Sequence, residues 1–388
     1  MNTVKKVAIP EELTEIFTTA YKQRASDIHF EIFDNKAIIR FRIDGVMHPF
    51  KEIKKEIYPE YCKQIKIMSK MNSEEINRPQ DGRIQLVLDD ENIDLRVAVC
   101  PTVFGESMCL RILTRSAITF SLNAVFLTEE HQKILKEWTA RQFGIILTSG
   151  PTGSGKTTTL YSLLNEFNKE THKIWTVEDP VEYILNGINQ IQLNVKAGLT
   201  FSSILRSILR QDPDIVMIGE IRDSETGNLA VNTALSGHLV LSSMHAENAT
   251  QGMIRMRDMG LESFLIKDAL SGIMSQRLVR QLCKNCMEAY TVDKTTITQL
   301  GLPQKKYYRA KGCGECHNTG FKGRAALYEF FSMQKYSGNM FMNGCTADEL
   351  RKQALKEGMI SIRQDGFAKA VQGLTSIDEV LRVTAGTD

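Results

Sequence analysis

The sequence predicts an α/β protein in which a parallel sheet with a phosphate-binding loop follows a smaller α+β domain. Three observations support this prediction. Short apolar runs alternate with helical stretches after residue 144, runs of alternating polarity occur before residue 114, and a glycine-rich loop stands between one apolar run and a helix. Strands of a covered parallel sheet have this apolar character, because helices bury both faces.

The composition is that of a soluble globular chain. Of 388 residues, 42% are hydrophobic and 24% are charged, which argues against disorder and low-complexity repeats. The 48 basic and 46 acidic residues leave a net charge of +2, so the overall charge does not favour nucleic acid. No apolar run approaches the roughly 18 residues of a membrane span, and the start lacks the apolar core of a secretory signal. We therefore expect a cytosolic protein whose membrane contacts are peripheral.

The first part of the chain has the pattern of strands with one buried and one solvated face. Residues 37–43, 94–99 and 110–113 alternate between apolar and polar side chains, as half-buried strands do. A helix over 58–71 separates these strands. The solvated face is expected to carry four arginines: Arg40, Arg42, Arg96 and Arg111.

Residues 115–124 show no periodicity and are expected to be a linker. A helix then begins after Thr128 and runs toward Trp138. Glu129 and Glu130 lie in its first turn, where the helix dipole favours negative charge. The apolar runs predicted to form the parallel sheet are 145–148, 174–177, 215–218 and 239–242.

A phosphate-binding loop follows the first of these strands. The run is Gly150-Pro151-Thr152-Gly153-Ser154-Gly155-Lys156-Thr157, with a helix from Thr158. Glycines let backbone N–H groups approach phosphate oxygens, and the helix start directs its dipole at them. Lys156 is expected to reach the β- and γ-phosphates, and the Thr157 hydroxyl to bind Mg²⁺. The alternative is a glycine-rich turn without a ligand.

Acidic and imidazole side chains follow three other predicted strands. They are Glu178, Glu220 and His245, which converge beside the loop if the strands are neighbours. Glu220 is expected to hold Mg²⁺, and Glu178 to orient or deprotonate the attacking water. Structural alternatives stay open: a helix-capping or solvated carboxylate for Glu178, an ion pair with Arg222 for Glu220, and a purely structural role for His245.

Four of the eight cysteines form two close pairs, Cys283 with Cys286 and Cys313 with Cys316. Two such pairs can surround Zn²⁺ with a tetrahedron of thiolates, and four protein ligands would make the metal structural. Redox-active pairs or coincidence are the alternatives.

Together these motifs resemble those of the secretion ATPase superfamily, which contains type II secretion ATPases and type IV pilus assembly ATPases. The resemblance begins at Ala25 and covers nearly the whole chain. The Walker A loop of that family resembles residues 150–159 here, its aspartate box residues 177–183, its Walker B segment residues 209–223, and its histidine box residues 236–245.

The resemblance implies further residues of the nucleotide site. It adds His238 and His245, and it implies that arginines of the first domain approach the nucleotide. The candidates are Arg83, Arg96 and Arg111, and a solvated strand face is the alternative for each. The tetracysteine region is typical of assembly and secretion members and is usually missing from retraction members.

The resemblance also implies a division of the chain. We expect a PAS-like N-terminal domain over 1–114, the linker over 115–124, a RecA-like P-loop core over 125–280, a tetracysteine zinc subdomain over 281–325, and a C-terminal helical region over 326–388.

The expected function is that of a homohexameric ATPase at the cytoplasmic face of the inner membrane. Its hydrolysis of ATP would drive assembly of a type IV pilus or a type II secretion pseudopilus through an inner-membrane platform protein. The expected cofactors are ATP, Mg²⁺ and structural Zn²⁺, with no stable nucleic acid partner.

Two other functions remain open. One is a DNA-dependent RecA-like motor, such as a helicase or conjugation ATPase. The other is a nucleotide-gated adaptor that binds ATP without hydrolysing it. The near-neutral charge and the four family motifs argue against the DNA motor, and the presence of Lys156, Glu178 and Glu220 argues against the adaptor.

Overall fold

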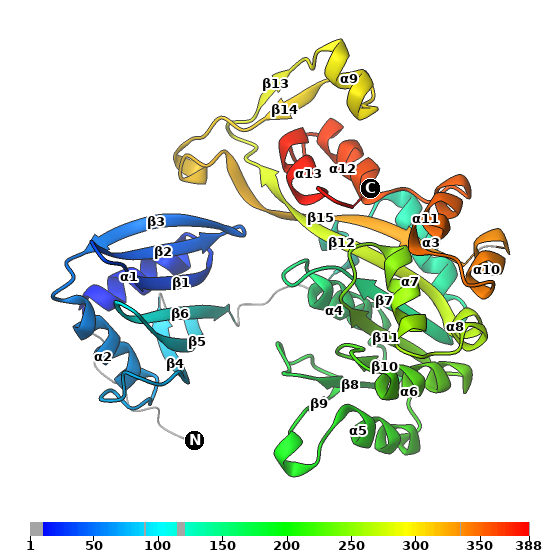
Figure 1. The fold of residues 1–388 in the computed structure, drawn as a ribbon, viewed down its shortest axis with the longest axis horizontal. Helices are drawn as coiled ribbons and strands as arrows, with labels where there is room; N and C mark the ends of the chain where they lie inside the picture. Colours follow the sequence, from blue (N-terminus) through cyan, green and yellow to red (C-terminus); the bar gives the residue numbers. More distant parts are fainter. Residues whose placement is uncertain (1–10, 89–90, 115–120, 334, 388) are drawn as a thin grey trace. The chain divides into compact units, whose positions relative to one another are not determined.

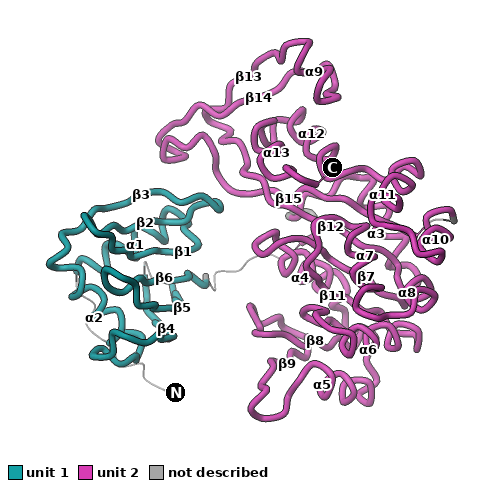
Figure 2. Tube along the Cα trace, in the orientation of Figure 1, with its two compact units in different colours: residues 1–118 teal, residues 119–388 magenta. Residues whose placement is uncertain are grey.

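The computed structural model describes residues 11–88, 91–114, 121–333 and 335–387. The chain divides into two compact units, residues 1–118 and residues 119–388 (Figure 2). The division lies within the predicted linker, residues 115–124, although Leu122–Val125 form a 3₁₀ turn that packs in the second unit. Linker residues 115–120, like residues 1–10, lie outside the described residues.

The first unit is a six-stranded antiparallel sheet of order β3-β2-β1-β6-β5-β4, with two helices (Figure 1). Its elements are α1 (Glu11–Lys22), β1 (Ala25–Ile32), β2 (Ala37–Ile43), β3 (Val46–Ile53), α2 (Tyr58–Met68), β4 (Gln80–Leu88), β5 (Glu91–Thr102) and β6 (Gly105–Thr114). The α+β architecture, the three predicted strands and the intervening helix are therefore present. That the unit is PAS-like stays a prediction.

Both helices of the first unit pack on one face of the sheet. Phe17 of α1 and Ile65 of α2 are buried in the same cluster as Ile28 and Phe30 of β1 and Leu110 of β6. Alternate residues of the strands point to the other face, which is polar. The core therefore lies on one side, and the charged side chains gather on the other.

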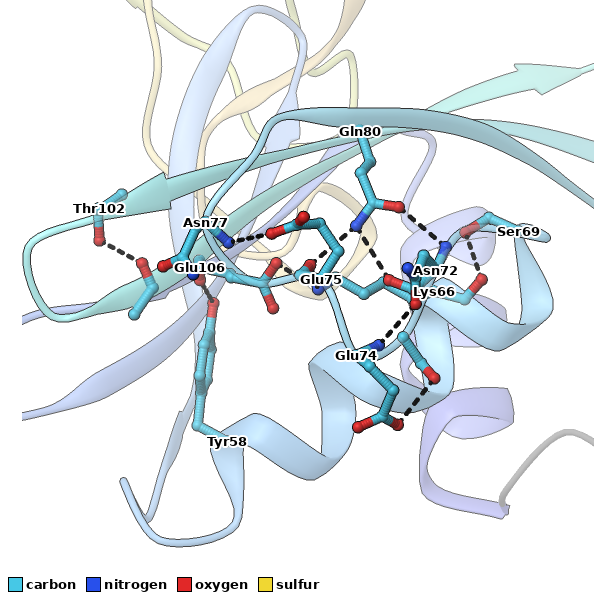
Figure 3. Close-up of polar contacts among 12 residues, drawn as sticks. Tyr58, Lys66, Ser69, Asn72, Glu74, Glu75, Asn77, Gln80, Thr102 and Glu106 are labelled. Atoms are coloured by element: carbon cyan, nitrogen blue, oxygen red, sulfur yellow. Dashed lines mark hydrogen bonds and ion pairs between the residues drawn. The ribbon is translucent and has the colours of Figure 1, made fainter.

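A buried ion pair fixes the loop between α2 and β4. Lys66 is fully buried and pairs with Glu106 of β6, and its Nζ donates to the carbonyl oxygen of Glu75 at 2.8 Å (Figure 3). Gln80 closes the loop, because its Nε2 donates to the carbonyl oxygens of Asn72 and Glu75, each at 3.0 Å. A buried ammonium group is tolerated only when it is paired, so these contacts hold the loop in one conformation.

The second unit is built on a seven-stranded sheet of order β15-β12-β7-β11-β10-β8-β9. Its strands are β7 (Gly144–Ser149), β8 (Ile174–Glu178), β9 (Asn189–Gln192), β10 (Ile215–Ile218), β11 (Leu239–Met244), β12 (Leu270–Leu282) and β15 (Phe321–Phe331). Neighbouring strands are parallel, except that β12 and β15 run antiparallel. The four predicted parallel strands are confirmed. One prediction is wrong: residues 326–331, expected to begin a helical region, belong to strand β15.

Helices cover both faces of this sheet, as predicted. They are α3 (Glu129–Thr139), α4 (Lys156–Phe167), α5 (Phe201–Ile208), α6 (Ser224–Leu235), α7 (Ala249–Asp258), α8 (Ser263–Ala269), α10 (Lys335–Met342), α11 (Ala347–Lys356), α12 (Ile362–Val371) and α13 (Ile377–Val383). On β7, Ile146 packs in one cluster with Trp138 of α3 and Leu160 of α4. Its neighbour Ile145 packs in the opposite cluster with Ala230 of α6.

A small subdomain carries the cysteines and is inserted between β12 and β15. Its elements are β13 (Glu288–Tyr290), α9 (Lys294–Leu300) and β14 (Tyr307–Arg309), which Figure 1 shows projecting beyond the β12–β15 pair. Short 3₁₀ turns complete the unit: η1 (Leu122–Val125), η2 (Val195–Ala197), η3 (Leu209–Gln211) and η4 (Gly314–Cys316). Among the described residues, no helix has both the length and the apolar character that crossing a bilayer requires.

Candidate active site

The predicted phosphate-binding loop joins the end of β7 to the start of α4. Gly150, Gly153 and Gly155 have φ angles of 147°, 78° and 89°, a region that side chains rarely adopt. Gly150 also has no space for a side chain, because a Cβ there would lie 2.6 Å from the carbonyl oxygen of Gln276. The strand, glycine loop and helix that a P-loop requires are all present.

Lys156 begins α4 and folds back over the loop. Its Nζ donates to the carbonyl oxygens of Gly150 at 2.8 Å and Pro151 at 3.1 Å. Burial, followed by the positive charge of Arg277, lowers the pKa of Lys156 to about 8. Both effects disfavour the ammonium ion, so a bound anion would stabilise it.

The other polar residues of the loop and the helix start differ in burial. Ser154 is buried, and its carbonyl oxygen accepts a hydrogen bond of 2.7 Å from the Nε2 of Gln276, so β12 braces the loop. Thr152, Thr157 and Thr158 are exposed.

Glu220 and His245 meet at the edge of the sheet beside this loop. β7, β11, β10 and β8 are consecutive parallel neighbours, so their carboxyl ends lie at one edge, as expected. The Oε2 of Glu220 lies 3.4 Å from the Nε2 of His245. Glu220 also forms an ion pair with Arg222, so this structural interaction is present as well. Burial, followed by the charge of Lys156, lowers the pKa of His245, which keeps its imidazole neutral at pH 7.

Glu178 ends β8 in different surroundings. It is buried, and its carboxylate accepts hydrogen bonds from Thr176 Oγ1 at 2.6 Å, from Gln190 Nε2 at 3.1 Å and from the hydroxyl of Tyr161. Since Tyr161 lies on α4, this carboxylate links the helix of the phosphate loop to β8 and β9. The burial excludes the solvated alternative for Glu178.

His238 does not join this cluster. It precedes the first residue of β11, and its carbonyl oxygen accepts from the N–H of Gly144 at 3.1 Å at the start of β7. The six residues of β11 span about 20 Å at the rise of a strand. His238 therefore lies at the opposite edge of the sheet from His245 and the loop.

The three predicted arginines stand in one row on the polar face of the first unit. Strand register places Arg83 beside Arg96, Arg96 beside Arg111, and Arg111 beside Asp27. Arg83 pairs with buried Asp94, and the Nε of Arg111 lies 3.0 Å from the Oδ1 of Asp27. The side chains of Arg83 and Arg111 are nonetheless 55% and 63% exposed. Buried aspartates therefore orient guanidinium groups that remain accessible.

The four paired cysteines gather into one cluster. Their sulfur atoms all lie within 4.8 Å of one another. The Sγ–Sγ distances are 3.9 Å for Cys283–Cys313, 3.8 Å for Cys286–Cys316 and 3.7 Å for Cys313–Cys316. Four thiolates about 2.3 Å from a tetrahedral zinc ion stand about 3.8 Å apart. The cluster therefore has the dimensions of a metal site rather than of two disulfides.

Backbone N–H groups also point at the sulfurs. Gly312 donates to the Sγ of Cys286 at 3.3 Å, and Cys313 and Gly320 donate to the Sγ of Cys316, each at 3.2 Å. Although burial opposes it, these last two donors and the neighbouring thiols of Cys313 and Cys286 lower the pKa of Cys316 to about 7. At Cys286 the bond from Gly312 acts in the same direction, but burial outweighs it and raises the pKa to about 11. Such bonds stabilise thiolates, which are the metal-binding form of cysteine.

Residues 2–382 match the family described as type II/IV secretion system protein. This chain belongs to that family. The match covers both units and confirms the resemblance that the motifs indicated.

Relatives of both branches are similar over nearly the whole chain. The type II secretion system protein E of Pseudomonas aeruginosa is 42% identical over 375 residues, which cover 96% of this chain and 74% of that protein. The type IV pilus assembly ATPase PilB of Myxococcus xanthus is 41% identical over 377 residues, which cover 95% of this chain and 67% of that protein. The chain is therefore an ATPase of the secretion and pilus assembly type.

Solved structures share the fold. The ATPase DotB of Legionella pneumophila has a TM-score of 0.72 at 20% identity, covering 100% of this chain and 98% of that chain. The pilus retraction motor PilT with bound ADP has a TM-score of 0.62 at 23% identity, covering 96% of this chain and 97% of that chain. These likenesses show that the chain has the same mixed α/β fold as these two structures.

Sequence reasoning missed the residues that hold the site together. Gln276 of β12 braces the loop, while Tyr161 of α4 and Gln190 of β9 hold Glu178. None belongs to a strand end or a glycine loop. Their only signal is a polar side chain within or beside an apolar run, which is also common in residues of no functional importance.

Proposed function

We propose that this ATPase acts as a homohexameric ring at the cytoplasmic face of the inner membrane, where ATP hydrolysis drives assembly of a type IV pilus or a type II secretion pseudopilus. The observation that carries the proposal is the loop between β7 and α4 with Glu220 and His245 at the adjacent strand ends. The chain's relatives include protein E of type II secretion and PilB of type IV pilus assembly.

In the proposed mechanism, the loop and Lys156 hold the phosphates of ATP. Backbone N–H groups and the start of α4 surround the phosphates, and the ammonium of Lys156 moves from the loop carbonyls to the β- and γ-phosphates. Thr157 and Glu220 would hold Mg²⁺, since hydroxyl and carboxylate oxygens suit this ion. When bound, Mg²⁺ supplies charge neutralisation at the phosphates.

Glu178 is proposed to orient the attacking water. A carboxylate has about four acceptor positions, and three hydrogen bonds to Glu178 leave one for water. The three donors fix the direction of the carboxylate, which is what positioning a nucleophile requires. His245 stays neutral and contacts Glu220, so we assign it to positioning that carboxylate.

The arginines of the first unit are proposed to approach the γ-phosphate when ATP is bound. Arg83, Arg96 and Arg111 share one face, and charge on the transferred phosphoryl group is stabilised by guanidinium groups. Movement of the first unit would then follow the nucleotide. Neighbouring copies of the chain and an inner-membrane platform protein are the proposed recipients of that movement.

A genetic test addresses the biological role. Deleting the gene in its native host should abolish surface pili or type II secretion, and the wild-type gene should restore them. The Glu220→Gln gene should not, although its protein accumulates to the same level. Unchanged pili and secretion after deletion would refute the proposed role. Strong stimulation of the purified ATPase by single-stranded DNA would instead support the DNA motor.

The cysteine cluster is proposed to hold one structural Zn²⁺ through Cys283, Cys286, Cys313 and Cys316. Purified protein should contain about one zinc ion per chain, and Cys283→Ser with Cys286→Ser should remove it while ATP still binds. His317 is adjacent but exposed, so His317→Ala is the matched control and should keep the metal. Zinc far below one per chain in the wild type would refute this assignment.

A further inference from the structure

β12 extends past the edge of the sheet and runs alongside the phosphate loop. Its parallel pairing with β7 ends at Ser275 opposite Ser149, the last residue of β7. β12 continues to Leu282, supported by the antiparallel strand β15. The residues that follow Ser275 therefore stand beside the loop rather than in the parallel core. Gln276 demonstrates this, since its side chain contacts the carbonyl oxygen of Ser154.

Arg277 is the next residue, and it lines a cavity beside the phosphate loop. A cavity of about 540 Å³ is lined by Gly150 and Pro151 of the loop, by His245, and by Arg277 and Arg255. Glu247 and Asp258 also line it. The cavity thus opens directly onto the first residues of the phosphate-binding loop.

Arg277 makes hydrogen bonds without a carboxylate partner. Its Nη2 donates to the carbonyl oxygen of Glu247 at 2.6 Å and its Nη1 to that of Gln276 at 3.2 Å. Among the described residues, no carboxylate forms an ion pair with it. A half-buried guanidinium group bound only to carbonyl groups retains donors for an anion.

The cavity adjoins the end of the loop where the terminal phosphate of ATP is expected. The Nζ of Lys156 lies on the carbonyl oxygens of Gly150 and Pro151, and a P-loop lysine reaches the β- and γ-phosphates. The charge of Arg277 also lowers the pKa of Lys156, so the two cations are close. The carboxylates of Glu247 and Glu329 favour the charged form of Arg277, but among the described residues neither forms an ion pair with it. Lys156 and Arg277 are therefore two neighbouring cations that can take a polyanion.

We propose that Arg277 binds the γ-phosphate of ATP and thereby makes the site prefer ATP to ADP. This inference rests on the proposed function, because it requires that ATP occupies the loop. The planar fork of arginine matches the oxygens of a phosphate. Binding of the γ-phosphate would replace its hydrogen bonds to the carbonyl groups of Glu247 and Gln276.

The test compares nucleotide affinities of the full chain in the presence of Mg²⁺. ATPγS and ADP are titrated into the wild type, Arg277→Gln, Arg277→Lys and a control, Arg206→Gln. Arg206 is an exposed residue of α5 that pairs with Glu225 at 3.4 Å. Arg206→Gln therefore removes one positive charge, as Arg277→Gln does, but at a different place on the surface. Thermal unfolding confirms that each variant is folded.

We expect Arg277→Gln to weaken ATPγS binding about tenfold or more, the effect of losing a charge-assisted hydrogen bond, while ADP affinity changes less than about threefold. Arg277→Lys keeps the charge without the fork and should give a smaller loss confined to ATPγS. Arg206→Gln should match the wild type with both nucleotides.

Equal losses for ATPγS and ADP, or no loss for either, would overturn the role of Arg277. If Arg277→Gln does not fold, the affinities of Arg277→Lys for ATPγS and ADP are compared with those of the wild type instead. A wild type that binds neither nucleotide would overturn the proposed function itself, whereas a wild type that binds ATPγS no better than Arg277→Gln would overturn only this inference.

Discussion

Glu178 ends β8 and Glu220 follows β10, the neighbouring strand, yet the surroundings of the two carboxylates differ. Glu178 is buried and accepts three hydrogen bonds, whereas Glu220 is partly exposed and interacts with His245 and Arg222. A fixed carboxylate suits the positioning of water, and a more accessible one suits a metal ion. The two roles proposed for these carboxylates rest on this difference in local packing.

Replacing each carboxylate by its amide tests this separation. Glu178→Gln and Glu220→Gln should each lower ATP turnover about a hundredfold or more, the size of effect typical of lost general-base or electrostatic groups. Glu178→Gln should leave the affinity for Mg²⁺ with ATPγS unchanged, and Glu220→Gln should weaken it. Steady-state turnover and a Mg²⁺ titration measure both quantities. A variant that hydrolyses ATP at the wild-type rate would remove that residue from the mechanism.

His131 makes the stability of the second unit depend on pH. It lies on α3 and stacks on Phe330, with ring centroids 4.6 Å apart, and neither ring nitrogen has a hydrogen-bond partner. Burial lowers its pKa to about 4; the charge of Asp365 opposes this shift, and the charge of Lys369 adds to it. As the pH falls, His131 therefore becomes protonated near pH 6.5 in the unfolded chain but only near pH 4 in the folded chain.

Stability should accordingly fall as the pH drops from about 6.5 to about 4, with a contribution of about 3 kcal/mol from His131. His131→Phe keeps the stacking and removes the titrating group. Denaturant unfolding at pH 7 and pH 4.5 should show a smaller loss for this variant than for the wild type. Equal losses in the two proteins would show that His131 does not contribute.

Among the elements, α2 carries a buried and an exposed lysine that serve as a matched pair. Lys66 is fully buried against Glu106, whereas Lys63 pairs with Glu74 at 3.0 Å with both side chains more than half exposed. Buried pairs lose about 3–5 kcal/mol when one partner is removed, and exposed pairs about 0–1 kcal/mol.

Lys66→Met should therefore destabilise the first unit by about 3 kcal/mol or more, and Lys63→Met by less than about 1 kcal/mol. Unfolding of the first unit, followed by a probe in α2, measures both. If the two substitutions have the same effect, the buried pair does not hold the loop between α2 and β4.

Elements with a strong local pattern could be predicted, and elements that depend on distant pairing could not. The four strands of the parallel core are short apolar runs between helices, and the helix after Thr128 begins where its side chain accepts from the N–H of His131 at 3.2 Å. β15 was missed because Ala325, Ala326 and Leu327 suit a helix as well as a strand. Its pairing with β12, far away in the sequence, decides the conformation.

The same contrast between local pattern and distant pairing explains which residues of the site could be predicted. The loop and the strand-end side chains Glu220 and His245 are local features of the sequence, and the parallel order of the strands brings them together. His238 was grouped with His245 through the resemblance, but the length of β11 separates the two. The contact of Gln276 with the loop depends on how far β12 extends beyond β7, which no local pattern reveals.

For the whole molecule, functional groups are distributed over both units. The first unit presents a row of arginines on an open sheet face, and the second holds the phosphate-binding loop and the cysteine cluster. Neither unit alone carries all the groups proposed to contact ATP.

The loop at residues 150–157 is proposed to bind ATP for hydrolysis. The most direct test measures nucleotide affinity and Mg²⁺-dependent turnover for the wild type and Lys156→Ala. We predict that the wild type binds and hydrolyses ATP, while Lys156→Ala loses about tenfold or more in affinity and all measurable turnover. A Lys156→Ala protein with the affinity and turnover of the wild type would show that this loop does not bind ATP for hydrolysis.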